Sequence, residues 1–89
     1  MAREELQSAS DELRQAAEAT EGDVQDRIYE QSNQLATLAT RDEGPDHGRL
    51  DRHMNALYEL ADDLDGDARE RVLAARDQVR EYRTGVEGV

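Results

Sequence analysis

The sequence predicts an all-α protein, an up-down-up-down four-helix bundle built from two similar helical hairpins. Three observations lead to this prediction. Apolar residues recur every three or four positions through most of the chain, short Gly-Asp turns interrupt that period, and the two halves of the chain align with each other. A chain of 89 residues is the size of one small domain, so we expect a single helical domain over residues 1–89, with hairpins at 3–40 and 46–84.

The two hairpins are predicted to be copies of one helix-turn-helix unit. A shift of 44 positions places Leu6 on Leu50 and, over the best-matched stretch, residues 21–28 on residues 65–72. Any two amphipathic hairpins align at some offset, so we infer the duplication from the turn chemistry and the apolar phase, which agree at this one offset. Two copies are too few for a solenoid and suit four helices that close on themselves.

The first hairpin is expected to contain helices over about residues 3–20 and 24–40. Gly22 suits the left-handed conformation that follows a helix, and Asp23 is placed to cap the second helix with its carboxylate. The positions with core spacing in this hairpin are Leu6, Ala9, Leu13, Ala16 or Ala17, Thr20, Val24, Ile28, Gln31, Leu35 and Leu38. Alanine fills most of the core face of the first helix, so we expect that face to be thin.

The second hairpin follows a polar loop. Pro45 suits a first helical turn, with Gly44 or Asp46 as alternative caps, and Gly66 with Asp67 repeats the earlier turn. The core positions expected here are Leu50, Met54, Leu57, Leu60 or Ala61, Leu64, Ala68, Val72, Ala75, Val79, Tyr82 and Val86. Short turns make the flanking helices antiparallel neighbours. The rival arrangement is a looser pair of hairpins that completes its core by dimerisation, because a core of this size stabilises a chain only modestly.

The composition excludes several classes of protein. The chain has no Cys, so neither disulfides nor thiolate metal sites are possible. Its first residues do not resemble a signal peptide, and its apolar runs are too short to cross a bilayer. No glycine-rich phosphate loop, nucleophile elbow or zinc-ligand spacing occurs. We therefore expect a soluble cytoplasmic protein that is not an enzyme and has no cofactor and no small-molecule substrate.

The charge favours a salty working environment. Twenty-two acidic residues oppose eleven arginines, which gives a formal net charge of −11 and an isoelectric point near 4.4. The content of Leu, Ile and Val is below the level of roughly 20% that is typical of disorder at high charge, yet the helical period is too regular for a disordered tail. At about 1 M salt the Debye length is about 3 Å, so crowded carboxylates stop repelling one another. The composition is therefore typical of a halophilic protein.

Three stretches carry a resemblance to a known family. They are residues 44–50 (Gly-Pro-Asp-His-Gly-Arg-Leu), residues 54–57 (Met-Asn-Ala-Leu) and residues 86–89 (Val-Glu-Gly-Val). With them the chain resembles a family of short acidic haloarchaeal proteins, whose members are helical and functionally uncharacterised. The resemblance spans nearly the whole chain and implies no catalytic residues.

His47 and Asp51 are weak candidates for chemistry. They lie four positions apart on one flank of the third helix with Tyr58 along the same line, an arrangement that can hold a metal or relay a proton. Solvent-exposed pairing is the commoner role for such residues. His53 borders the apolar stripe, and we expect it to be packed at the edge of the core. We predict no catalytic residue and no metal site.

Four arginines form a stripe on the last helix. Arg69, Arg76, Arg80 and Arg83 fall within about 60° of one another around the helix axis, to one side of the core direction. Such a stripe can meet phosphates or an acidic partner, or it can pair with the acidic flanks of neighbouring helices. The net charge of −11 repels nucleic acid, which disfavours the first use.

Two further residues are candidates for contact with a partner. Tyr29 and Leu73 each project about 140° from the core stripe of their own helix, and they are equivalent under the 44-residue shift. Apolar groups off the core and related by internal symmetry favour a surface for another chain, such as a second copy in a homodimer. The predicted function is a non-enzymatic helical protein-protein interaction module that self-associates. The alternative is a small regulator or adaptor that contacts nucleic acid, or a nucleic-acid-binding protein, through the arginine stripe.

The charge generates a prediction about salt. Dilution from about 2 M KCl to dilute buffer is expected to loosen the fold, because the carboxylates then repel one another without screening. Helicity by circular dichroism and radius of gyration by small-angle scattering measure the effect. Unchanged helicity and compactness after salt removal would contradict the halophilic interpretation.

Overall fold

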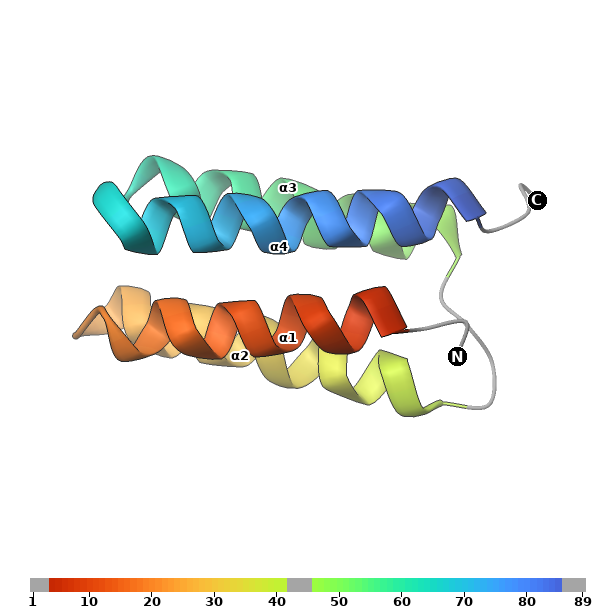
Figure 1. Cartoon of the computed structure of the whole chain (residues 1–89), viewed down its shortest axis with the longest axis horizontal. Coiled ribbons are helices and arrows are strands. Elements are labelled where there is room, and N and C mark those ends of the chain that lie inside the picture. Colours follow the sequence, from red (N-terminus) through yellow and green to blue (C-terminus); the bar gives the residue numbers. More distant parts are fainter. Residues whose placement is uncertain (1–3, 42–45, 86–89) are drawn as a thin grey trace.

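A computed structural model describes residues 4–41 and 46–85 and shows a bundle of four helices (Figure 1). The helices are α1 (Glu4–Glu18), α2 (Asp23–Thr40), α3 (His47–Asp62) and α4 (Gly66–Gly85), and the described residues contain no strand. Successive helices run in opposite directions, and the molecule measures 36 × 20 × 17 Å with a radius of gyration of 12.2 Å. These features confirm the predicted all-α, up-down-up-down bundle.

Glycine forms both tight turns. Gly22 has φ of 76° and Gly66 has φ of 60°, in the left-handed region where a Cβ atom would be strained. The prediction that Asp23 caps α2 is wrong. Gly22 itself occupies the cap position and makes no side-chain capping bond, while Asp23 already lies in the first helical turn. There its negative charge still acts favourably on the helix dipole.

Asp46 caps α3. Its Oδ1 atom accepts a hydrogen bond from the backbone N–H of Arg49 at 2.8 Å, so of the two predicted caps Asp46 is the one used. The other residues that the sequence analysis places at the helix ends, Gly44, Pro45 and Val86, lie outside the described residues.

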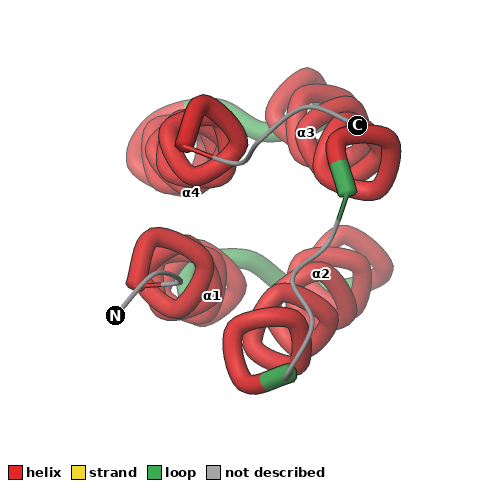
Figure 2. The backbone as a smooth tube through the Cα atoms, turned by 90° about the vertical axis from the view of Figure 1, so that its right-hand side faces the viewer, coloured by secondary structure: helices red, strands yellow, loops and turns green. Residues whose placement is uncertain are grey.

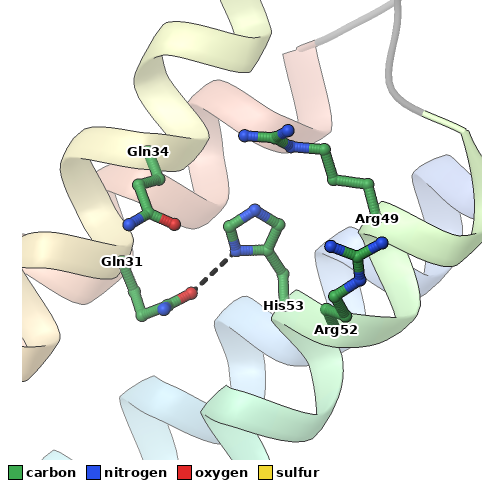
Figure 3. Close-up of a pocket in the computed structure, with 5 residues that line it drawn as sticks. All are labelled: Gln31, Gln34, Arg49, Arg52 and His53. Carbon is green, nitrogen blue, oxygen red and sulfur yellow. Dashed lines mark hydrogen bonds between the residues drawn. The ribbon is translucent and has the colours of Figure 1, made fainter.

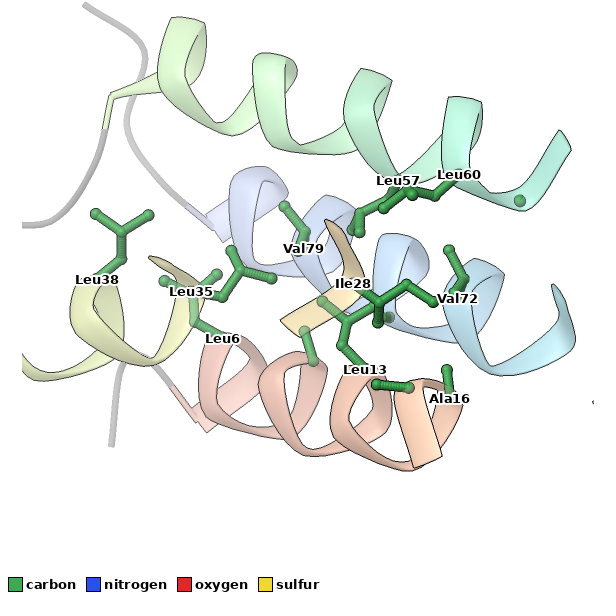
Figure 4. Close-up of a cluster of buried hydrophobic side chains, with 14 of the residues drawn as sticks. Leu6, Leu13, Ala16, Ile28, Leu35, Leu38, Leu57, Leu60, Val72 and Val79 are labelled. Atoms are coloured by element: carbon green, nitrogen blue, oxygen red, sulfur yellow. The ribbon is translucent and has the colours of Figure 1, made fainter. Parts of the chain in front are cut away.

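The core contains one row of apolar side chains from each helix (Figure 4). Most of the predicted core positions are buried, whereas Thr20, Val24, Gln31, Met54 and Leu64 are only half-buried. The buried members are Leu6, Ala9, Leu13, Ala16, Ala17, Ile28, Leu35, Leu38, Leu50, Leu57, Leu60, Ala61, Val72, Ala75, Val79 and Tyr82. The apolar period was therefore a sound guide to the interior.

A buried pair of serines joins α1 to α2. The hydroxyl of Ser10 donates to the carbonyl of Ser32 at 2.8 Å, and the hydroxyl of Ser32 donates to the carbonyl of Ser10 at 3.0 Å. Both residues are fully buried, and each hydroxyl has its partner. Two small side chains bonded to each other's backbone hold these helices close together.

The four interhelical contacts are unequal (Figure 2). The helix α1 packs closely against both α2 and α4, and α3 packs closely against α4, whereas α2 and α3 touch least. In the end-on view α2 is tilted so that one of its ends lies away from α3. The seam between α2 and α3 is consequently the place where polar side chains can enter the bundle.

Truncation of a leucine is expected to destabilise the protein more in the core than at the edge of the core. Leu13 is fully buried, so Leu13→Ala should reduce the free energy of unfolding by about 2–5 kcal/mol. The matched variant Leu73→Ala removes the same atoms from a half-buried side chain and should cost less than about 2 kcal/mol. Urea unfolding followed by circular dichroism gives both values. Equal losses for the two variants would contradict the burial described here.

Candidate functional site

Tyr58 lies at the centre of a groove on the outer face of α3 and α4. Its side chain is 53% exposed, and it is the one exposed large apolar residue in the described ranges 4–41 and 46–85. The guanidinium group of Arg76 stacks over its ring at 5.5 Å from the centroid, a cation–π arrangement. Met54, Asn55 and Arg80 complete a groove with a volume of about 320 Å³.

The predicted arginine stripe divides into engaged and available members. Arg69 donates to the carbonyl of Ala61 at 3.3 Å, and the guanidinium group of Arg83 lies 2.7 Å from the carboxylate of Asp51. Arg76 pairs with its neighbour Asp77 at 2.9 Å. Arg80 is exposed and forms no ion pair with any described residue. The available member of the stripe is thus Arg80, which lines the Tyr58 groove.

His47 and Asp51 do not come together with a third ligand. Asp51 is held by Arg83 across the α3–α4 interface, and His47 is half-buried at the start of α3. Within residues 4–41 and 46–85, no group of three His, Asp or Glu side chains is arranged to hold a metal ion. The pairing of Asp51 with an arginine agrees with the commoner role expected for it.

Tyr29 and Leu73 are less exposed than the sequence predicts. Both are half-buried and pack against the hydrophobic core cluster, so the expectation that they project freely from the bundle is corrected. Each helix of a four-helix bundle faces two neighbours, and its buried arc is therefore wider than the single stripe from which the angle of about 140° was measured. Their remaining exposed surface is small.

A second site lies at the α2–α3 seam and was not predicted (Figure 3). Gln31 and Gln34 of α2 face Arg49, Arg52 and His53 of α3 around a pocket with a volume of about 190 Å³. The i, i+3, i+4 spacing of the three α3 residues puts them on one face, which is a signal that the sequence contains. Among the residues that the structure describes, no carboxylate lines this pocket, although the chain has 22 acidic residues.

The ring of His53 bridges the two helices of the seam. It is only 5% exposed, and its Nδ1 atom lies 2.8 Å from Oε1 of Gln31. Because an amide oxygen can only accept, Nδ1 carries the proton and Nε2 is the unprotonated nitrogen of the neutral ring. The expected packing of His53 at the edge of the core is confirmed.

The surroundings of His53 disfavour its charged form. Burial lowers its pKa from the ordinary value of 6.5, and the positive charges of Arg49 and Arg52 lower it further. The residues of α2 that line the pocket with it, Gln31 and Gln34, are uncharged. At neutral pH the ring is therefore neutral, and the positive charge at the seam comes from the two guanidinium groups.

The fold and these sites define a small antiparallel four-helix bundle with one aromatic groove and one polar seam. The model of a family described as "Family of unknown function (DUF7553)" matches residues 1–85, and the chain belongs to this family. No curated protein and no solved structure matches the chain. Each helix in the described ranges 4–41 and 46–85 is too short or too polar to cross a lipid bilayer.

The pKa of His53 makes stability depend on pH. A histidine whose pKa is lower in the folded than in the unfolded state stabilises the fold above the unfolded pKa. This contribution is lost as the pH falls from 6.5 through the folded pKa. We expect the free energy of unfolding to decrease between about pH 7.5 and pH 5.5, above the usual carboxyl range, and to decrease less in His53→Gln.

Urea unfolding at the two pH values measures this difference, and NMR titration of the ring measures the pKa itself. A folded-state pKa at or above the ordinary value would contradict the electrostatic description of the seam.

Proposed function

We propose that this protein is a non-enzymatic helical interaction module that docks a second protein chain in the Tyr58 groove. The observation that supports the proposal is the exposed ring of Tyr58 with the guanidinium group of Arg76 stacked on it. Tyrosine and arginine are the residue types, with tryptophan, that contribute most binding energy in protein interfaces. The ring is held in place by its cation–π partner, so less side-chain freedom is lost on binding.

A second copy of this chain is the partner that the charges favour. The two arginines of the groove lie beside exposed acidic residues of the same helix, so the patch can be complementary to the same patch of another copy. Along α4 the basic residues Arg76 and Arg80 alternate with the exposed acidic residues Asp77 and Glu81. A two-fold axis through this patch can bring the arginine of each copy opposite an acid of the other, as an isologous dimer requires.

The proposed surface differs from the one expected from the sequence. Tyr29 and Leu73 are half-buried against the core and therefore have less area to offer a partner than Tyr58 does. The groove retains two of the four predicted arginines, Arg76 and Arg80, and adds the aromatic residue Tyr58.

The alternative, a regulator that contacts nucleic acid through the arginine stripe, receives less support. Arg69 and Arg83 are bonded within the chain, and Asp77 neutralises Arg76, so few cations remain for phosphate contacts. The net charge of −11 also opposes the approach of a polyanion.

The proposal includes a high-salt cytoplasm as the working environment. Two molecules of this charge repel each other in dilute buffer, and salt removes the long-range repulsion. Contacts enclosed within the groove are screened less, so an aromatic and hydrogen-bonded interface can persist at salt concentrations that weaken surface ion pairs.

Charge reversal in the groove tests the proposal. We expect a concentration-dependent dimer in about 2 M KCl, measured by light scattering, and weakening by about tenfold or more in Tyr58→Ala and Arg80→Glu. The first variant removes the aromatic contact, and the second places a carboxylate where a partner carboxylate is expected.

Arg14→Glu is the matched control. Arg14 is an exposed arginine on α1, outside the groove, and its reversal changes the net charge by the same amount. It should leave dimerisation unchanged. A monomer at all concentrations, or equal weakening by Arg14→Glu and Arg80→Glu, would contradict docking in this groove.

A further inference from the structure

The pocket at the α2–α3 seam concentrates positive charge without a counter-ion. Of the described arginines, Arg27, Arg71, Arg76 and Arg83 each pair with a carboxylate. Arg49 and Arg52, which line the pocket, form no ion pair with any described residue. Other described arginines, such as Arg14 and Arg41, also form no such ion pair, and Arg49 and Arg52 differ from them in lining one pocket together.

The two arginines are arranged in a way that costs energy unless an anion is present. They lie three positions apart on α3, where side chains are neighbours and like charges destabilise a helix. Figure 3 shows the guanidinium group of Arg49 above the ring of His53, on the side of its Nε2 atom, and that of Arg52 on the α3 side of the ring. A single anion in the pocket would remove this repulsion and accept hydrogen bonds from both groups.

Two of the remaining lining residues, Gln31 and Gln34, supply neutral donors. His53 donates from Nδ1 to Gln31, so its unprotonated Nε2 atom can only accept a hydrogen bond. In Figure 3 this nitrogen points to the side of the ring on which the guanidinium group of Arg49 lies. The amide nitrogen of Gln34 lies 3.4 Å from the carboxylate of Glu30, a long contact that it can exchange for a ligand at little cost.

The size and chemistry of the pocket limit what it can hold. Its volume of about 190 Å³ is below the roughly 300–1,000 Å³ of pockets for drug-sized ligands. Guanidinium groups match the geometry of phosphate and carboxylate oxygens, and two of them favour an anion with two charges over an anion with one.

We propose that this pocket binds a small, doubly charged tetrahedral oxyanion, a phosphate group, between Arg49 and Arg52, with the side-chain amides of Gln31 and Gln34 completing its hydrogen bonds. The site lies at the α2–α3 seam and is independent of the Tyr58 groove, which belongs to α3 and α4. The acidic surface repels phosphate at long range, but salt screens that repulsion more than it screens contacts inside a partly enclosed pocket.

NMR titration with potassium phosphate near pH 7.5, at a fixed ionic strength of about 0.5 M in KCl, tests this proposal. We expect saturable shifts of the His53 ring and of the Gln31 and Gln34 side-chain amides. The dissociation constant should be on the order of 1 mM, because two charge-assisted contacts to partly exposed groups bind modestly. Absence of saturable shifts at these side chains would overturn the proposal.

Arginine substitutions give the matched comparison. Arg49→Gln and Arg52→Gln remove one charge each from exposed side chains without an ion pair to break, and each should weaken phosphate binding about tenfold. Arg14→Gln removes the same charge on α1 and should leave the dissociation constant unchanged. Equal effects of all three variants would mean that phosphate responds only to net charge, and the site would be rejected.

The choice of anion distinguishes the ligand class. Sulfate should bind like phosphate, and acetate should bind much more weakly. An equal response to acetate would contradict a site for a doubly charged oxyanion. Inorganic phosphate and glycerol 3-phosphate separate the two sources of a phosphate group: tighter binding of the first supports the free ion, and tighter binding of the second supports a phosphate ester.

The pKa of His53 in the presence of sulfate also tests whether the anion binds beside this ring. Sulfate does not titrate between pH 5 and pH 8, so any pH dependence comes from the protein. An anion beside His53 offsets the charges of Arg49 and Arg52 that lower its pKa. Saturating sulfate should therefore raise the pKa of His53, and an unchanged pKa would place the anion elsewhere.

Discussion

Close packing of α1 against both of its neighbours is the contact on which the rest of the bundle depends. Its core face combines Leu6 and Leu13 with three fully buried alanines, Ala9, Ala16 and Ala17. Small side chains let the backbones of α2 and α4 approach, and the hydroxyl of Ser10 satisfies a carbonyl of α2 at the same level. A chain with so little apolar material obtains dense packing from short distances more than from large side chains.

The dependence of close packing on small side chains also explains where the polar sites lie. Helices α1 and α3 are equivalent under the 44-residue shift, which places Ala9 on His53 and Ala75 on Gln31. The two alanines are fully buried in the core formed with α1 and α4, whereas the larger polar pair bridges α2 and α3 by a hydrogen bond. The close α1–α4 interface and the polar α2–α3 seam therefore occupy corresponding positions in the two hairpins. They differ here in the size and polarity of two side chains.

The helices and most of the core were predictable because both follow from local periods and caps. The periodic positions such as Ile28, Leu57 and Val79 are all buried, and Asp46 caps α3 as one of two candidates. Asp23 was misplaced because a cap depends on the backbone angles of the residue itself, which the sequence does not display. The error concerns one residue and leaves the helix intact.

The sites were harder to predict because they depend on how far apart two helices lie. A helical wheel has one core direction, while Tyr29 and Leu73 lie within a buried arc that faces two neighbours. The sequence does not single out Arg49 and Arg52, because the arginines are most numerous on α4 and only the spacing of α2 from α3 makes their face a pocket. The contact of Arg76 with the exposed ring of Tyr58 likewise depends on how α3 packs against α4.

The buried serine pair has a consequence for the history of the fold. Under the same shift Ser10 falls on Met54 and Ser32 falls on Arg76, two of the residues that line the Tyr58 groove, one from each helix. One hairpin is joined at these positions by two hydroxyls, whereas the other has a thioether and a guanidinium group there. If the hairpins are duplicates, one has kept the role of scaffold while the other has been free to diverge. A new surface can arise in this way when two side chains change and the backbone fold stays the same.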